Sequence, residues 1–125
     1  MIRILVIDDE EEICSLTKSF LTKRNYQVFT ANNAAEAINA LKTEHPQLVL
    51  LDVRLGSVSG MDVLKTIKEI DSNVKVIMVT ALNDDENIKE AMSLGANDYI
   101  TKPFTAAYLN DLLAQKLADL GGGSK

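Results

Sequence analysis

Four aliphatic residues in a row lead directly into a carboxylate in the stretch Leu48-Val49-Leu50-Leu51-Asp52. Because no polar residue alternates with the aliphatic ones, the stretch is typical of a strand that is covered on both faces in a parallel sheet. Asp52 then stands at the carboxyl end of this strand. In open α/β sheets ligands bind at that edge, so the stretch predicts both a fold class and the place of a site.

Three further apolar segments also end in polar residues, and these residues are Asp8 and Asp9, Thr80, and Lys102. The carboxyl ends of parallel strands share one edge of a sheet, so we expect all four side chains to gather around Asp52. Three acids, a hydroxyl and an ammonium group would then converge from four separate segments. This convergence is the central prediction from the sequence.

The whole chain alternates between strand patterns and helix patterns with short connections. The predicted strands lie at residues 2–7, 27–30, 48–52, 74–80 and 99–101, and the helices with their capping positions at 11–23, 33–45, 59–70, 83–95 and 105–120. Five strands and five helices joined by right-handed crossovers give a doubly wound parallel sheet of the α/β class.

Helix ends carry recognisable signals. Asn33 is a predicted N-cap, and Ser59 with Asp62 has the spacing of a capping box. The second helix is expected to end before Pro46, because a residue that precedes proline avoids the helical region. Gly95 is expected to end the fourth helix in the left-handed conformation.

Apolar residues at helical spacing predict which side of each helix is buried. The predicted buried sides include Leu16 in the first helix, Ile70 in the third and Met92 in the fourth. Cys14, the only cysteine, cannot form an internal disulfide and is interpreted as a small buried apolar group. His45 is interpreted as solvent-facing.

Composition limits the classes of function. A chain of 125 residues fits one domain, predicted at residues 1–120, and residues 121–125 have the composition of a flexible linker. The tail could be a natural tether, a tether to an output domain, or an expression remnant.

A net charge of -5 argues against direct nucleic-acid binding by counterion release. With no leader and no uncharged stretch that could span a bilayer, we expect a cytoplasmic protein without membrane contact.

The polar groups at the predicted rim suit phosphoryl chemistry. Asp8, Asp9 and Asp52 would repel one another unless a cation joined them. Carboxylates, a backbone carbonyl and waters are ligands for Mg²⁺, which readily accepts a phosphate oxygen. Lys102 would add positive charge and Thr80 a hydroxyl. Asp52 could act as the nucleophile, because such a transfer needs mostly positioning and charge stabilisation, and a phosphohistidine is a suitable donor.

At these residues the chain resembles a receiver domain of two-component response regulators, over residues 1 to about 120. The matching motifs are Val6-Ile7-Asp8-Asp9-Glu10, Leu51-Asp52, Gly60-Met61, Thr80-Ala81, Gly95-Ala96-Asn97-Asp98-Tyr99 and Lys102-Pro103-Phe104. Each motif alone is weak, but together in this order and at these spacings they are highly specific. The resemblance implies a flavodoxin-like (βα)5 fold with the strand order 2-1-3-4-5.

The resemblance also implies a role for each acid. Asp52 would accept a phosphoryl group from the phosphohistidine of a partner sensor histidine kinase or phosphotransfer protein. Mg²⁺ would be held by Asp9, Asp52 and the backbone carbonyl of Arg54. Asp8 would act mainly through water.

Four more residues would carry the response in such a domain. Lys102 would bind the phosphoryl group, Thr80 would move toward it, and Tyr99 would turn inward into the vacated space. The Lys102-Pro103 bond is expected to be cis. The changed surface of the fourth helix, fifth strand and fifth helix would then control an output domain or partner protein, and would favour a weak homodimer that depends on phosphorylation.

Some positions depart from the family pattern. The loop after Asp52 often carries a proline where this chain has Gly56, which predicts a more mobile loop. The last helix contains no arginine, which argues against the charge-paired dimer face of winged-helix regulators. Arg54 and Leu82 follow Asp52 and Thr80 by two residues, and their bulk is expected to obstruct a water that attacks the phosphoryl group.

Other classes of function leave different signatures. A receiver-like interaction module without phosphorylation is the main alternative, and it would not need all five polar side chains. A flavin carrier would want a hydroxyl-rich phosphate loop where residues 8–12 are acidic. A phosphatase of the haloacid dehalogenase type would have its nucleophile on the first strand and an acid two residues later. Glu10 does follow Asp8 at that distance, so the polar side chains at the other strand ends decide against this class.

Overall fold

The computed structural model describes residues 1–81 and 84–122, with side chains up to residue 117. The strands of the main sheet are β1 (Arg3–Ile7), β2 (Gln27–Ala31), β3 (Leu48–Asp52), β6 (Lys75–Ala81) and β7 (Asp98–Lys102). The helices are α1 (Glu11–Thr22), α2 (Ala34–Glu44), α3 (Gly60–Ile70), α4 (Asp85–Ser93) and α5 (Ala106–Gly122). A short antiparallel hairpin, β4 (Arg54–Leu55) and β5 (Val58–Ser59), follows β3.

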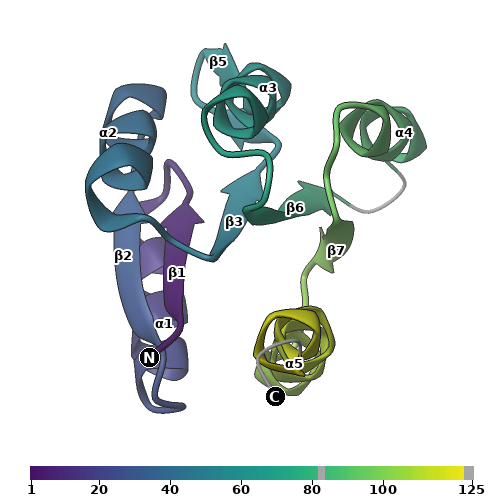
Figure 1. Cartoon of the computed structure of the whole chain (residues 1–125). Helices are drawn as coiled ribbons and strands as arrows, with labels where there is room; N and C mark the ends of the chain where they lie inside the picture. The colour runs from purple at the N-terminus through teal and green to yellow at the C-terminus, as the bar shows by residue number, and fades with distance from the viewer. Residues whose placement is uncertain (82–83, 123–125) are drawn as a thin grey trace.

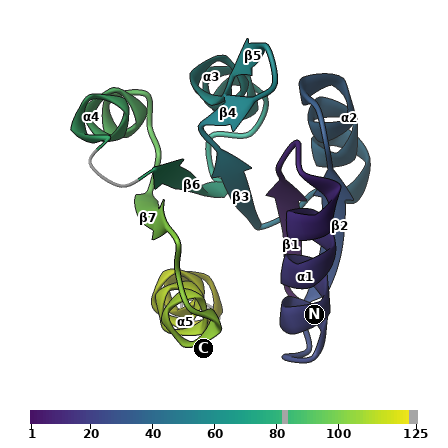
Figure 2. The ribbon, with the colours of Figure 1, turned by 180° about the vertical axis from the view of Figure 1, so that it is seen from behind.

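All neighbouring strands of the main sheet are parallel, in the order β2-β1-β3-β6-β7. This is the expected order 2-1-3-4-5, because β6 and β7 are the fourth and fifth strands of the sheet. Helices α1 and α5 lie on one face and helices α2, α3 and α4 on the other (Figure 1). Figure 2 shows the same three layers from behind, from the side on which β4 and β5 lie. The predicted α/β doubly wound fold is confirmed.

The central strands are buried on both faces of the sheet. Residues 48–51 of β3 are at most 3% exposed, as the unbroken aliphatic run predicts. Leu48 and Leu50 belong to the apolar cluster beneath α1 and α5, whereas Val49 and Leu51 belong to the cluster beneath α2 and α3. Since side chains alternate between faces along a strand, two-sided burial of this run leaves only its end, Asp52, to meet solvent.

The predicted helix ends are largely confirmed. Asn33 accepts a hydrogen bond from the backbone N–H of residue 36 at 2.9 Å, and Gly95 follows α4 with φ of 102°. The second helix ends at residue 44, and exposed His45 adopts a left-handed φ of 50°. Ser59 caps α3, but its hydroxyl accepts from Met61 N–H at 3.1 Å. Among the described residues, Asp62 makes no reciprocal bond, so this cap is simpler than the predicted capping box.

Three residues predicted to be buried are exposed: Leu16 by 62%, Ile70 by 41% and Met92 by 44%. In α1 the buried residues are Cys14 and Leu21, and Leu16 lies two residues from Cys14, about 200° around a helix of 3.6 residues per turn. Met92 follows the buried Ala91 and is turned by about 100° from it. Ile70 is the last residue of α3, where the chain leaves the helix.

Element boundaries differ from the predictions by a few residues. The first described residue of the fourth helix is Asp85, and the predicted start at Asn83 lies outside the described residues. Helix α5 continues to residue 122, two residues beyond the predicted end, and the remaining tail residues 123–125 also lie outside them. The β4–β5 hairpin stands where a loop was predicted.

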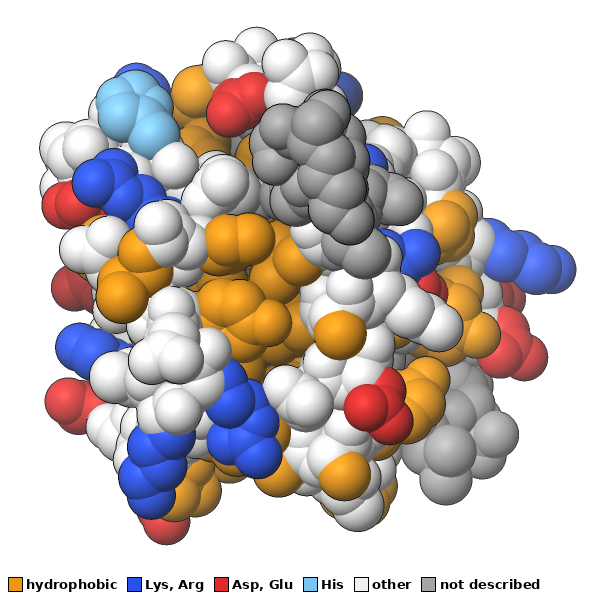
Figure 3. All heavy atoms as spheres, turned by 60° about the horizontal axis from the view of Figure 1, so that its bottom comes forward, with side chains coloured by type: hydrophobic (Ala, Val, Ile, Leu, Met, Phe, Trp, Pro, Cys, Tyr) orange, Lys and Arg blue, Asp and Glu red, His pale blue; other side chains and the backbone are white. Residues whose placement is uncertain are grey.

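The surface viewed from the side of α1 and α5 carries both signs of charge. Figure 3 shows a hollow lined by apolar side chains, with basic and acidic side chains distributed around it. Within the described part of the chain, every helix is too short or too polar to cross a bilayer.

Candidate functional site

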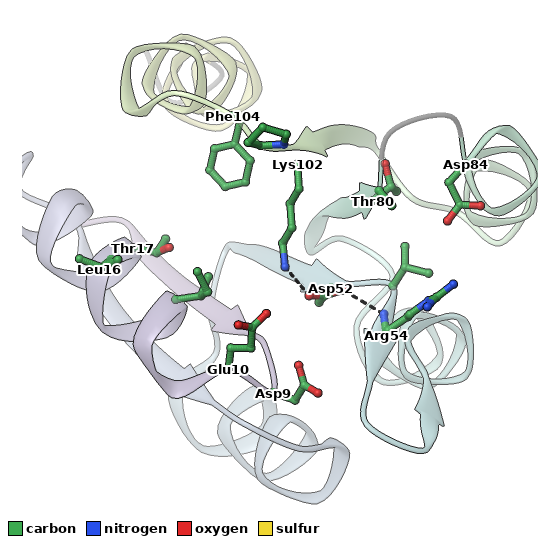
Figure 4. A pocket seen from close by; sticks show the side chains of 14 residues that line it. Asp9, Glu10, Leu16, Thr17, Asp52, Arg54, Thr80, Asp84, Lys102 and Phe104 are labelled. Atoms are coloured by element: carbon green, nitrogen blue, oxygen red, sulfur yellow. Dashed lines mark hydrogen bonds and ion pairs between the residues drawn. The ribbon is translucent and has the colours of Figure 1, made fainter.

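Lys102 joins two of the predicted acids at the carboxyl edge of the sheet. Its Nζ lies 2.8 Å from Asp52 Oδ2 and 3.3 Å from Asp8 Oδ2. Figure 4 shows the lysine side chain reaching from the end of β7 across the edge toward Asp52 at the end of β3. The Lys102-Pro103 peptide bond is cis. Residues separated by up to 94 positions in the sequence therefore meet at one point.

The backbone around Asp52 fixes the direction of its carboxylate. Asp52 Oδ1 accepts a hydrogen bond from Arg54 N–H at 2.9 Å, which leaves Oδ2 for Lys102. Gly60 N–H donates to the Val53 carbonyl at 2.6 Å and so ties the start of α3 to the end of β3. A Cβ at position 60 would collide with the carbonyl oxygen of Asp52 and lie 2.7 Å from that of Val53. Only glycine therefore allows this close approach.

Asp8 is the more deeply buried of the two acids bound to Lys102, with a side chain 5% exposed against 13% for Asp52. Burial raises the pKa of Asp8 and the negative charge of Asp52 adds to the rise, although a hydrogen bond from Glu10 N–H and the charge of Lys102 oppose it. The Asp8 backbone carbonyl accepts from Asn32 Nδ2 at 3.0 Å. The surroundings of Asp8 therefore disfavour the ionised form of its carboxyl group.

Lys102 experiences the opposite balance. Burial disfavours the ammonium ion, but the hydrogen bond and charge of Asp52, together with those of Asp8, outweigh it and raise the pKa of Lys102. The lysine side chain is 32% exposed, so its charged end can be reached from solvent. A cation that is this firmly protonated can bind an incoming anionic group.

Asp9 and Glu10 extend the acidic site beyond the two acids that Lys102 bridges. Carboxylate oxygens of Asp8, Asp9 and Glu10 all lie within 4.8 Å of one another. Asp9 Oδ2 also accepts a hydrogen bond from the Gly56 N–H at 3.1 Å. The sequence predicted Asp8 and Asp9 as site residues, whereas Glu10 was named as part of the first family motif and not as a site residue. Its place directly after two acids at a strand end was the signal that could have included it.

The donor set fits a hard divalent cation. Asp9 and Asp52 offer carboxylate oxygens, and Arg54, which begins β4 two residues after Asp52, adds a backbone carbonyl. Oxygen ligands of this kind match Mg²⁺. Leu82, which was expected to shield the site together with Arg54, lies outside the described residues.

Thr80 lies next to the end of β6 and is 2% exposed. Its Oγ1 is buried and has no hydrogen-bond partner among the described residues. In Figure 4 the hydroxyl points away from Asp52, although both residues line the same cavity. An unpaired buried hydroxyl is costly, so the Thr80 side chain is ready to accept a new partner.

Tyr99 on β7 does not point into this cavity. The side chain is 39% exposed and lines a separate hollow together with Tyr108 of α5. The neighbouring residue of β7, Asp98, forms an ion pair of 3.0 Å with Lys116 of α5. The tyrosine is therefore in the outward position from which an inward turn could start.

Asp9, Glu10, Asp52, Thr80 and Lys102 line a cavity of about 790 Å³. One wall of this cavity is apolar and includes Ile13 and Leu16 of α1 and Phe104 after β7 (Figure 4).

The model of the response regulator receiver domain family matches residues 4–114. The chain belongs to this family. Receiver domains act in two-component signalling and are not enzymes in the usual sense.

Similar receivers occur both alone and within longer regulators. Sporulation initiation phosphotransferase F of Bacillus subtilis is 36% identical over 92% of this chain and 93% of its own length. Chemotaxis protein CheY of the same organism is 35% identical over 83% of this chain and 88% of its own length. For the transcriptional regulatory protein PhoP, also from Bacillus subtilis, the identity is 37% and the match spans 45% of that protein.

The fold is shared with solved receiver structures. A CheY-like receiver domain protein from Methanospirillum hungatei JF-1 superposes with a TM-score of 0.93 at 30% identity, over 98% of both chains. The receiver domain of NtrX from Brucella abortus gives a TM-score of 0.85 at 33% identity, over 93% of this chain and 98% of that receiver.

Proposed function

We propose that this receiver accepts a phosphoryl group on Asp52 from a phosphohistidine of a partner histidine kinase or phosphotransfer protein. The observation that carries this proposal is the position of Lys102, whose ammonium group binds Asp52 at 2.8 Å and the buried Asp8 at 3.3 Å beside a cavity that Lys102 and Asp52 line. An ordinary structural ion pair would need one acid, whereas this lysine is shared and partly exposed.

In the proposed transfer an oxygen of Asp52 attacks phosphorus while the P–N bond to the donor imidazole breaks. A P–O bond forms, and the imidazole nitrogen leaves with the electron pair of the broken bond. Lys102 neutralises charge on the phosphoryl oxygens, and the buried Thr80 hydroxyl offers them a hydrogen bond. Asp52 needs no general base, because its carboxylate is already a nucleophile in the charged form.

Mg²⁺ would supply additional positive charge on the transferred group when it is bound. Asp9, Asp52 and the carbonyl of Arg54 would hold it, and Asp8 would contribute through water. The hard oxygen donors on this edge and the proximity of Asp8 and Asp9 support this assignment.

The proposed response is a change at the surface formed by α4, β7 and α5. Thr80 would turn toward the phosphoryl group and Tyr99 would move from its outward position into the vacated space. The unpaired Thr80 hydroxyl and the 39% exposure of Tyr99 are consistent with these two movements. An output domain, a partner protein or a second copy of the chain would read the changed surface. We place this signalling in the cytoplasm.

A protein donor is supported by the apolar wall of the cavity. Leu16 is 62% exposed on α1 and lines the same cavity as Asp52. A small phosphodonor has no use for such a side chain, whereas a helix of a protein donor can bury it. The variant Leu16→Glu should therefore slow transfer from a phosphorylated protein donor by about tenfold, or about 1.4 kcal/mol, and leave labelling by acetyl phosphate unchanged. Equal loss with both donors would contradict this role.

The proposal can be tested by amide NMR with beryllium fluoride and Mg²⁺, which together mimic a phosphoryl group. The wild-type protein should show large shifts in β6 and β7, and the Asp52→Asn variant should show none. Mg²⁺ without beryllium fluoride serves as the control. A wild-type spectrum that does not respond, or a variant that responds equally, would remove Asp52 as acceptor and favour an interaction module without phosphorylation.

A further inference from the structure

The Gly56 backbone makes a contact with the acidic site that the proposed function does not use. Its N–H donates to Asp9 Oδ2 at 3.1 Å across 47 positions of sequence. Gly56 lies in the turn of the β4–β5 hairpin with a left-handed φ of 61°. The hairpin is anchored by Leu55, which is 4% exposed in the core. The direction of the N–H is therefore set by the hairpin and not by a flexible side chain.

This hydrogen bond leaves one oxygen of Asp9 available. A carboxylate has two oxygens that each accept bonds, and Oδ2 is engaged by Gly56. Among the described residues, Asp9 Oδ1 accepts no hydrogen bond. A carboxylate fixed through one oxygen presents the other in a defined direction, as partners behind a metal ligand commonly do.

We propose that Gly56 is a positioning residue for Asp9, whose backbone N–H orients this carboxylate and thereby sets the affinity of the site for Mg²⁺. The inference rests on the proposed Mg²⁺ site. A proline at position 56 could not make the contact, because it has no N–H and cannot adopt a positive φ. Chains of this family that carry proline there must orient the equivalent acid in another way.

Two substitutions at position 56 separate the N–H from the space around it. Gly56→Pro removes the donor. Gly56→Asn keeps the donor and tolerates the left-handed conformation, and no atom lies within 4 Å of an added Cβ. Isothermal titration calorimetry with Mg²⁺ should show about tenfold weaker binding for Gly56→Pro, in line with the loss of a bond behind a metal ligand, and a change below about twofold for Gly56→Asn.

A titration with Ca²⁺ distinguishes positioning from general disruption of the hairpin. Mg²⁺ demands near-octahedral ligands, whereas Ca²⁺ accepts irregular ones, so a misdirected Asp9 should weaken Mg²⁺ binding by a clearly larger factor. Circular dichroism establishes that both variants are folded. Wild-type affinity in Gly56→Pro, an equal loss in Gly56→Asn, or equal losses for both cations would overturn this inference while leaving the proposed function intact. A wild-type protein that binds no Mg²⁺ would overturn both.

Discussion

Replacement of Lys102 by methionine should strongly destabilise the protein in the absence of divalent cations. Methionine keeps an unbranched apolar chain but removes the charge that joins Asp52 and Asp8. Two acids would then remain in a partly buried site without a cation. The free energy of unfolding at neutral pH is therefore expected to fall by more than a surface ion pair would cost.

The distances give the size of the effect. With an effective dielectric constant of about 20, unit charges 2.8 and 3.3 Å apart attract by about 6 and about 5 kcal/mol. Burial of the three groups offsets most of this attraction, and loss of one partner of a buried pair typically costs about 3–5 kcal/mol. Because Lys102 is 32% exposed, water can replace part of the interaction. We therefore expect a loss of about 2–3 kcal/mol.

Urea unfolding followed by circular dichroism in the presence of EDTA measures this loss. The raised pKa of Lys102 means that its contribution is present at neutral pH and disappears only as the pH rises through the folded-state pKa. At acid pH the contribution also shrinks as Asp8, whose pKa is raised by burial, becomes protonated. Lys116→Met is the matched control: its lysine is 26% exposed, but its one partner at 3.0 Å, Asp98, is 29% exposed, so its loss should cost about 0.2–1 kcal/mol. Equal losses in both variants at neutral pH would refute the shared-cation reasoning.

Three further predictions follow from burial and close approach. Gly60→Ala should lower the free energy of unfolding, measured in urea, by about 1–3 kcal/mol, because the added Cβ would meet the backbone of Val53. A loss no greater than that of Gly56→Asn would contradict this prediction. The pKa of Asp8 is raised, so ionisation of Asp8 lowers the free energy of unfolding as the pH rises toward that pKa. In urea unfolding, Asp8→Asn should raise the free energy of unfolding by about 1 kcal/mol at pH 7 and leave it unchanged below about pH 4. A gain that persists in acid would argue against the electrostatic cause. Burial raises the pKa of Cys14 to about 11, so a disulfide reagent at pH 8 should label this thiol only after the protein is unfolded in guanidinium. Rapid labelling of the native protein would contradict the burial of the thiol.

The sequence predicts those features that depend on one segment at a time. The aliphatic run before Asp52 indicates a strand covered on both faces, and its end places the acid at a sheet edge. Parallel strands share that edge, so Lys102 and Thr80 could be expected near Asp52 without coordinates. The order of the strands does not follow from such patterns, because a run of apolar residues does not say which strand lies beside it. That order came from the family resemblance.

Other features depend on contacts that no local pattern contains. The bond between Gly56 and Asp9 joins two loops, and only the assembled sheet brings them together. The exposure of Leu16 has a similar origin. Its spacing from Ile13 and Phe20 suits a buried stripe, but the buried residues of α1 are Cys14 and Leu21, and the flank that carries Leu16 borders the cavity. Helical periodicity gives the angle between side chains around the helix, whereas packing against the sheet decides which of these side chains are buried.

The most direct test of the central claim is the intact mass of the protein after incubation with acetyl phosphate and Mg²⁺. The wild type should gain the mass of one phosphoryl group, and the gain should disappear in hydroxylamine, which cleaves acyl phosphates. Asp52→Asn should gain none under the same conditions. A wild type whose mass does not change, or an equal gain in Asp52→Asn, would contradict the assignment of Asp52 as the phosphoryl acceptor.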